Sequence, residues 1–284
     1  MGKAAVEINK SIIYIAGLPR SGSTLLCQLL GLHSSVDSSG HSSPLQGVLH
    51  ALRHQLSDNE FLLSQLDVDF ERGYQRLLNI NRSVINGWFA ETEKDWVVDK
   101  NRGWLSQIDL LSQLDPDFKM VVCVREPAQI YGSIEAQHQK TILLDFPDHS
   151  AALSRHARAD KLFGPEGVIG GPLKAIEALQ DIPDALQQRL FYVVFEHLVS
   201  EPQAVLSDLY QWLGLPASDF NPAALTVKPH ESDSYYRFKY SHQTQTRITP
   251  PSRHVIPARI QADIQQQFSD LYQLFYPGLL EANS

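Results

Sequence analysis

The chain has 284 residues, 43% of them hydrophobic, and a formal net charge of −8 at pH 7. Such a chain can bury a sizeable core in one large domain. The negative charge argues against a general nucleic-acid or membrane-surface binder, because such proteins need clustered positive charge. We therefore expect a single domain over residues 1–284, with no nucleic-acid or membrane partner and with local basic groups wherever an anion binds.

The cysteines and the apolar runs indicate the cellular compartment of the protein. Cys27 and Cys123 are the only cysteines, and each lies in an apolar segment, so we expect buried thiols and a reducing compartment. No run approaches the roughly 18 apolar residues of a membrane span. The first apolar run ends in Gly17 without a small-residue cleavage site, so it does not resemble a signal peptide. These features predict a cytoplasmic protein.

Four short runs rich in β-branched and aromatic residues are continuously apolar, which is typical of strands buried on both faces of a parallel sheet. They are "SIIYIAG" (11–17), "WVVDK" (96–100), "KMVVCVRE" (119–126) and "LFYVVFE" (190–196). Helical patterns lie between or after them, at 23–32, 104–114, 127–138 and 202–215. This alternation predicts an α/β three-layer sandwich with a central parallel sheet. We expect a helical insertion at about 41–95 and a polar, turn-rich, lid-like segment at about 217–256.

The turn between the first strand and the first helix is glycine-rich. It reads "GLPRSGST" (17–24) and follows the pattern G-x-x-x-x-G-x-[ST] of phosphate-binding loops. Such a loop points backbone N–H groups at an anion, and the following helix adds its positive N-terminal end. Ser23 stands where a lysine normally reaches the β/γ-phosphates, so the loop is poorly suited to ATP or GTP. Arg20 offers a permanent cation instead. The alternative is a turn that only joins the strand to the helix.

A second basic position follows the third strand. Within "VREPAQIYGS" (124–133), Arg125 ends the strand and Ser133 lies on the second turn of a helix that begins near Pro127. An ordinary surface ion pair is the alternative for such an arginine. Two anion sites at the carboxyl ends of parallel strands would suit a nucleotide with phosphates at separate positions.

Several of these segments together resemble one family. "GLPRSGSTLL", the "DK" that ends "WVVDK", "VVCVREPAQIYGS" and "VVFEHLVSEPQAVLSDLYQWLGL" are similar to segments of the sulfotransferases, over roughly residues 11–215. The P-R-S-G form is closer to the tyrosylprotein and bacterial types than to the cytosolic type. The resemblance implies transfer of a sulfonate from 3′-phosphoadenosine-5′-phosphosulfate (PAPS) to a hydroxyl acceptor.

The resemblance also implies roles for particular residues. The first loop would bind the 5′-phosphosulfate, and the arginine and serine after the third strand would bind the 3′-phosphate. The cofactor-binding positions that carry over are Gly17, Arg20, Ser21, Gly22, Ser23, Thr24, Arg125 and Ser133.

The chemistry is expected to need no metal. A sulfuryl group carries less negative charge than a phosphoryl group, so backbone donors and cations can serve where a kinase uses Mg²⁺. Arg20 is expected to stabilise developing charge, because a guanidinium does not deprotonate at working pH. Lys100 matches the family lysine near the leaving group and is the expected proton donor. The alternative is that Asp99 and Lys100 simply lie at the surface.

The acceptor hydroxyl must lose its proton to a base. His41, in "SSGHSSP", lies 21 residues after Arg20, where the resemblance to the tyrosylprotein enzymes places a catalytic glutamate. Histidine suits the task because its ordinary pKa near 6.5 leaves the imidazole largely neutral at pH 7. A solvated loop histidine is the alternative, and Asp99, His138 and His242 are rival bases.

The late segment "HESDSYYRFKYSHQTQTR" (230–247) interleaves aromatic and basic residues. We expect it to close over the adenine or the 3′-phosphate, with Arg237 and Lys239 binding the nucleotide; Arg247 is a further basic residue of the same segment. A plain surface loop is the alternative.

Two other functions fit a phosphate-binding loop, namely a nucleotide-dependent kinase and a non-catalytic nucleotide-binding module. The acceptor is open between a small molecule, a sugar and a peptide, and the oligomeric state is open as well.

Overall fold

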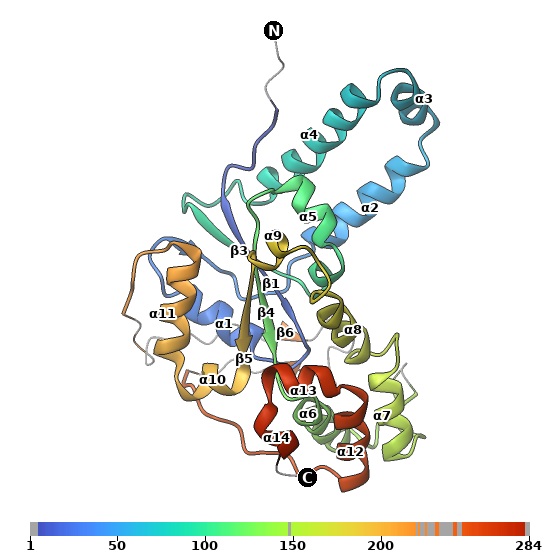
Figure 1. Cartoon of the computed structure of the whole chain (residues 1–284), viewed down its shortest axis with the longest axis vertical. Coiled ribbons are helices and arrows are strands. Elements are labelled where there is room, and N and C mark those ends of the chain that lie inside the picture. The colour runs from blue at the N-terminus through green and yellow to red at the C-terminus, as the bar shows by residue number, and fades with distance from the viewer. Residues whose placement is uncertain are drawn as a thin grey trace.

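The computed structural model describes residues 5–146, 149–219, 221, 225, 231–232, 241–242 and 246–281. Its centre is a five-stranded parallel sheet in the order β2-β3-β1-β4-β5 (Figure 1). The strands are β1 Ser11–Gly17, β2 Val36–Asp37, β3 Trp96–Lys100, β4 Lys119–Val124 and β5 Leu190–Val194. A separate antiparallel pair joins β6 (Glu231–Ser232) and β7 (Ser241–His242).

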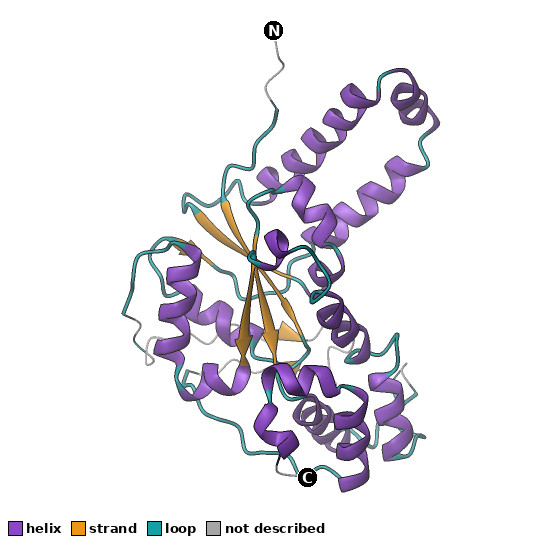
Figure 2. Cartoon of the chain, viewed as in Figure 1, coloured by secondary structure: helices purple, strands orange, loops and turns teal. Residues whose placement is uncertain are grey.

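Helices cover both faces of the sheet (Figure 2). One face packs against α1, α10 and α11, and the other packs against α5, α6, α8, α12 and α13. The helices are α1 Ser23–Leu30, α2 Leu45–Ser57, α3 Glu60–Val68, α4 Phe70–Trp88, η1 Arg102–Ser106, α5 Ile108–Leu114, α6 Pro127–Lys140, α7 Arg155–Phe163, α8 Gly170–Ala178, α9 Asp184–Gln187, α10 Phe195–Ser200, α11 Pro202–Leu213, α12 Ala258–Gln267, α13 Ser269–Phe275 and α14 Pro277–Glu281.

The sheet has a hydrophobic core on each face, and the side chains of the central strand β1 alternate between the two cores. Ile13 and Ile15 pack with α1 and α11 on one face, whereas Tyr14 packs with Trp104 on the other. Successive side chains of a strand point to opposite faces, and both faces of this strand are apolar. The predicted three-layer α/β sandwich is therefore confirmed.

The structure corrects the ends of two predicted strands. β4 ends at Val124 and β5 ends at Val194, each two residues earlier than predicted. The reason is that Pro127 begins α6 and Phe195 begins α10, so the chain has already turned. The edge strand β2 was not predicted, because two residues are too short to show a periodic pattern.

The segment 41–95 forms an arm of three helices. Helices α2 and α4 extend side by side from the body and α3 lies at the far end (Figure 1). Their bases pack into the core through Leu45, Leu49 and Ile85. Among the described residues, no helix combines the length and apolarity needed to span a membrane.

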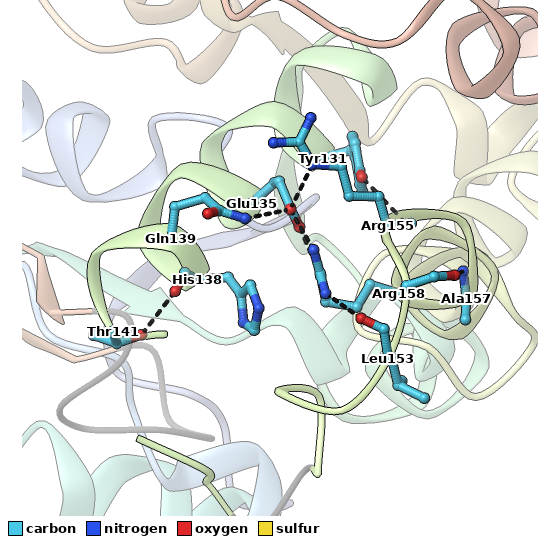
Figure 3. A network of polar contacts seen from close by, with 10 residues as sticks. Tyr131, Glu135, His138, Gln139, Thr141, Leu153, Arg155, Ala157 and Arg158 are labelled. Atoms are coloured by element: carbon cyan, nitrogen blue, oxygen red, sulfur yellow. Dashed lines mark hydrogen bonds and ion pairs between the residues drawn. The ribbon is translucent and has the colours of Figure 1, made fainter. Parts of the chain in front are cut away.

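An ionic cluster around Glu135 joins α6 to α7 (Figure 3). Arg158 donates from Nε to Glu135 Oε2 at 2.9 Å and from Nη2 to Oε1 at 2.5 Å. Gln139 donates to Oε1 at 3.0 Å, and Arg155 Nε lies 3.5 Å from the same oxygen. Burial alone would raise the pKa of Glu135, but the hydrogen bonds from Arg158 and Gln139 lower it below the ordinary value. The cluster thus stabilises the helix that carries Ser133.

Replacing Glu135 with glutamine is expected to lower the free energy of unfolding by about 3 kcal/mol at pH 7, because the buried Arg158 loses its ionic partner. A carboxyl whose pKa is lowered by folding stabilises the protein above its unfolded pKa of about 4.3, and this contribution is lost as the pH falls through the folded pKa. The difference in the free energy of unfolding between wild type and Glu135→Gln should therefore shrink as the pH falls from about 5 to 3. Urea unfolding of both proteins across this pH range measures that difference.

The exposed Glu166 offers a matched control, and Glu166→Gln is expected to leave stability nearly unchanged. If the loss of unfolding free energy in Glu135→Gln stays constant down to pH 3, the ionic role of the cluster is contradicted.

Candidate active site

A cavity of about 550 Å³ lies at the carboxyl ends of β1, β3 and β4. Ligands of open parallel sheets bind at this edge. Within the described part of the chain, its lining includes no Asp or Glu. The cationic and imidazole side chains that line it are Arg20, Lys100, Arg102, Arg125, Arg247 and His254. Five cationic side chains thus line one cavity of a chain whose net charge is −8, as an anion-binding site requires.

The two glycines of the loop are needed where they stand. Gly17 has φ 128° and Gly22 has φ 83°, values that side chains with a Cβ rarely adopt. A Cβ on Gly17 would lie 2.1 Å from the carbonyl oxygen of Cys123, and one on Gly22 would lie 2.6 Å from the Phe195 ring. The glycines therefore let the loop lie directly against β4 and α10.

The three hydroxyl groups of the loop have different surroundings. Ser21 is fully buried and donates to the carbonyl of Leu18 at 2.6 Å, so it stabilises the turn and does not line the cavity. Ser23 and Thr24 do line it, at the N-terminus of α1. A helix N-terminus of this kind attracts anions.

Lys100 reaches the loop from the end of β3. Its Nζ donates to Thr24 Oγ1 at 3.1 Å and to the Gly40 carbonyl at 2.9 Å. The residue is only 7% exposed, so the surface position considered as an alternative is wrong. A loop with serine in place of its usual lysine thus receives an ammonium group from a neighbouring strand.

Arg125 and Ser133 lie beside Arg20, so the two predicted anion sites meet. Arg125 Nη1 donates to the Arg20 carbonyl at 2.9 Å, and Arg20 Nε donates to Ser133 Oγ at 3.2 Å. The Arg125 guanidinium lies 4.5 Å from the centre of the Phe195 ring. Burial, and then the charge of Arg20, lower the pKa of Arg125, while Glu196 opposes the shift. Arg125 is only 6% exposed, so the alternative of an ordinary surface ion pair is wrong for this arginine.

Arg125 retains capacity for a further acceptor. Its Nε is buried and has no hydrogen-bond partner among the described residues. A buried donor without an acceptor costs free energy. An anion in the cavity would supply that acceptor.

His41 lies outside the cavity lining. Its side chain is exposed, although the next three residues, 42–44, do line the cavity. The surrounding loop is held at the site by Lys100, through Gly40, and by Asn101 Nδ2, which donates to the Ser43 carbonyl at 2.7 Å. The structure therefore brings the chain around His41 to the cavity, with the imidazole facing solvent.

The rival bases are placed differently. Asp99 is fully buried, accepts from Trp104 Nε1 at 2.6 Å, and has its pKa raised by burial. His138 is also buried, and neither residue lines the cavity. His242 belongs to β7. Arg237 and Lys239, expected to bind the nucleotide, lie outside the described residues.

The cavity also contains residues that the sequence analysis missed. Arg102 and Phe195 each follow the carboxyl end of a strand, so the rule that ligands bind at this edge could have found them. His254 carries no local signal, because it reaches the cavity from a segment far beyond Ser133 in sequence.

The chain belongs to the sulfotransferase family, whose model matches residues 12–219. Similar solved structures include a sulfotransferase from Alicyclobacillus acidocaldarius, 14% identical with a TM-score of 0.50, covering 78% of this chain and 87% of that one. The sulfotransferase domain of the curacin biosynthetic pathway is 18% identical with a TM-score of 0.49, covering 92% and 98%. The corresponding domain of the Synechococcus PCC 7002 olefin synthase is 19% identical with a TM-score of 0.47, covering 93% and 96%.

These structural likenesses concern the fold, and the family match confirms the resemblance noted in the sequence. A search of curated proteins finds no match to this chain. In the part of the chain that the structure describes, no group of three or more His, Cys, Asp or Glu side chains could hold a metal ion.

Proposed function

We propose that this chain, as a single domain over residues 1–284, transfers a sulfonate from PAPS to a hydroxyl-bearing acceptor. The observation that carries the proposal is the joining of two anion sites in one cavity by the hydrogen bond from Arg20 to Ser133. PAPS has a phosphosulfate at its 5′ position and a phosphate at its 3′ position. It therefore suits a cavity with two adjacent sets of anion-binding groups and no carboxylate among its described lining.

The nucleotide is proposed to bind through the groups expected from the sequence. The loop from Gly17 to Thr24 would hold the 5′-phosphosulfate, and Arg125 with Ser133 would hold the 3′-phosphate. Arg247 lines the cavity, which supports a role for the late segment in covering the nucleotide. Arg237 and Lys239 are proposed members of the same cover.

The transfer step is an in-line displacement at sulfur. The acceptor oxygen forms a bond to sulfur while the bond from sulfur to the bridging phosphate oxygen breaks, and adenosine 3′,5′-bisphosphate (3′,5′-ADP) leaves. Lys100 is proposed to give a proton or a hydrogen bond to that bridging oxygen, because its ammonium already contacts Thr24 of the loop. Arg20 would stabilise charge on the transferring group, and His41 would take the proton of the acceptor hydroxyl.

The acceptor is proposed to be a small molecule, a sugar or a peptide, and no metal is proposed to take part. We also propose a cytoplasmic location, which is consistent with two buried cysteine thiols.

Binding of 3′,5′-ADP in the presence of a metal chelator tests the nucleotide assignment. Adenosine 5′-phosphate is expected to bind more weakly by roughly tenfold to more than a hundredfold, because Arg125 and Ser133 would have no 3′-phosphate to hold. Isothermal calorimetry with both nucleotides measures the ratio. Equal affinities would overturn the assignment.

Ser133→Ala provides the matched variant for this test. This change should weaken the binding of 3′,5′-ADP and leave the affinity for adenosine 5′-phosphate unchanged. Ser57→Ala, at an exposed position of α2, should alter neither affinity. Stabilisation by ATP with Mg²⁺ in preference to 3′,5′-ADP would instead favour a kinase. Binding of PAPS without turnover across a panel of acceptors would favour a non-catalytic module.

A further inference from the structure

A short segment, residues 251–256, is fastened along one side of α6; we refer to it as the strap. Arg253 Nη2 pairs with Glu126 Oε2 at 2.6 Å. Gln129 makes two bonds with the backbone of His254, donating from Nε2 to its carbonyl at 3.2 Å and accepting from its N–H at 2.7 Å. Glu126 is the N-cap residue of α6, and Gln129 lies in the first turn of the helix.

Gly132, three residues after Gln129 and on the same side of α6, allows the strap to approach closely. A Cβ built on Gly132 would lie 2.4 Å from the Cβ of His254 and 2.7 Å from Ile256 Cδ1. Glycine at this position therefore lets the strap touch the helix backbone. Ser133, the next residue, lines the cavity, and His254 lines it as well.

The strap thus places an imidazole among the cations of the cavity. Burial lowers the pKa of His254, and the charges of Arg125 and Arg20 lower it further. The nearby carboxylates are engaged elsewhere, since Glu126 pairs with Arg253 and Glu196 accepts from the Tyr276 hydroxyl at 2.9 Å.

The other charged and titratable groups around this part of the cavity are few among the described residues. Lys100, Arg102 and Arg247 line the same cavity and are cationic, and no Asp or Glu joins them in the described lining. The surroundings therefore keep the imidazole neutral at pH 7 until negative charge enters.

We propose that His254 is a binding residue for the phosphate monoester held by Arg125 and Ser133, and that it takes up one proton from solvent when that phosphate binds. The inference rests on the proposed function, because it takes the 3′-phosphate of the nucleotide to be that monoester. The dianion offsets the field of the two arginines, and the newly protonated ring nitrogen donates a charge-assisted hydrogen bond to a phosphate oxygen. His254 would then favour a dianionic 3′-phosphate over a 3′-hydroxyl.

Calorimetry of 3′,5′-ADP binding at pH 7.0 tests this, in two buffers without phosphate whose ionisation enthalpies differ. The dependence of the observed enthalpy on the buffer measures the protons taken up. Wild type is expected to take up about half a proton more than His254→Gln, since an opposite charge shifts a nearby pKa by about 1–3 units. Affinity for 3′,5′-ADP should fall roughly tenfold in His254→Gln, and the gap should close near pH 8.5, where the imidazole remains neutral.

Two controls separate this linkage from other effects. His50→Gln alters an exposed histidine on α2 and should leave both the proton number and the affinity unchanged. Adenosine 5′-phosphate should show equal proton numbers with wild type and His254→Gln, because it lacks the 3′-phosphate. The proton that a phosphate itself loses cancels when the two proteins are compared with one ligand.

The outcomes distinguish the two proposals. If 3′,5′-ADP does not bind wild type, the proposed function and this inference both fail. If it binds wild type and His254→Gln with equal proton numbers, the inference is overturned and the nucleotide site stands. Should His254→Gln be unfolded, the imidazole resonances of wild type decide by NMR. A ring near the nucleotide whose pKa rises on binding supports the inference, and unchanged titration of all rings overturns it.

Discussion

Arg20→Ala is expected to lower kcat by about 10²–10³, the usual cost of removing one donor that stabilises transition-state charge. Its affinity for 3′,5′-ADP should fall by less than about tenfold, because Arg125, Ser133 and the loop backbone still hold the phosphates. Steady-state kinetics under saturating PAPS, together with calorimetry, separates the two effects.

Alanine is a suitable replacement at this position. Arg20 has φ 59°, and alanine keeps the Cβ that makes this conformation costly, so the strain in the loop is unchanged. Arg20→Lys retains the charge without the planar fork, and it should recover part of kcat. A loss confined to nucleotide affinity, with kcat intact, would make Arg20 a residue of the 3′-phosphate site, in line with its bond to Ser133.

His41→Ala is expected to lower kcat by about 10²–10⁴, the range that a general base contributes. Binding of PAPS should be nearly unchanged, because the His41 side chain does not line the cavity. His41→Glu should restore part of the rate, since a carboxylate can also accept the proton. Rate measurements under saturating PAPS with any acceptor found provide the test.

His50→Ala is the matched control, because His50 is an exposed histidine of the same arm, and its kcat should equal that of wild type. If His41→Ala keeps more than about a third of wild-type kcat, the base is another group. Asp99 is a poor substitute, because adjacent residues of a strand point to opposite faces and Lys100 points to the loop.

The local part of the site could be predicted from the sequence. The glycines of residues 17–24 are tied to backbone conformations that other residues rarely adopt, so their spacing alone indicates a phosphate-binding turn. Likewise, Arg125 follows an apolar strand and Ser133 lies two turns into the next helix. Strand and helix patterns of this kind depend on side chains close together in sequence.

Only the tertiary structure decided how these pieces meet. The strand order places β3 and β4 on either side of β1, which brings Lys100 to Thr24 and Arg125 to the Arg20 backbone. The strap on α6 adds His254 from the far end of the chain. Sequence periodicity reports which face of an element is buried, but not which element covers it. Contacts between distant segments therefore had to come from the packing of sheet and helices, and the same packing turned His41 outward.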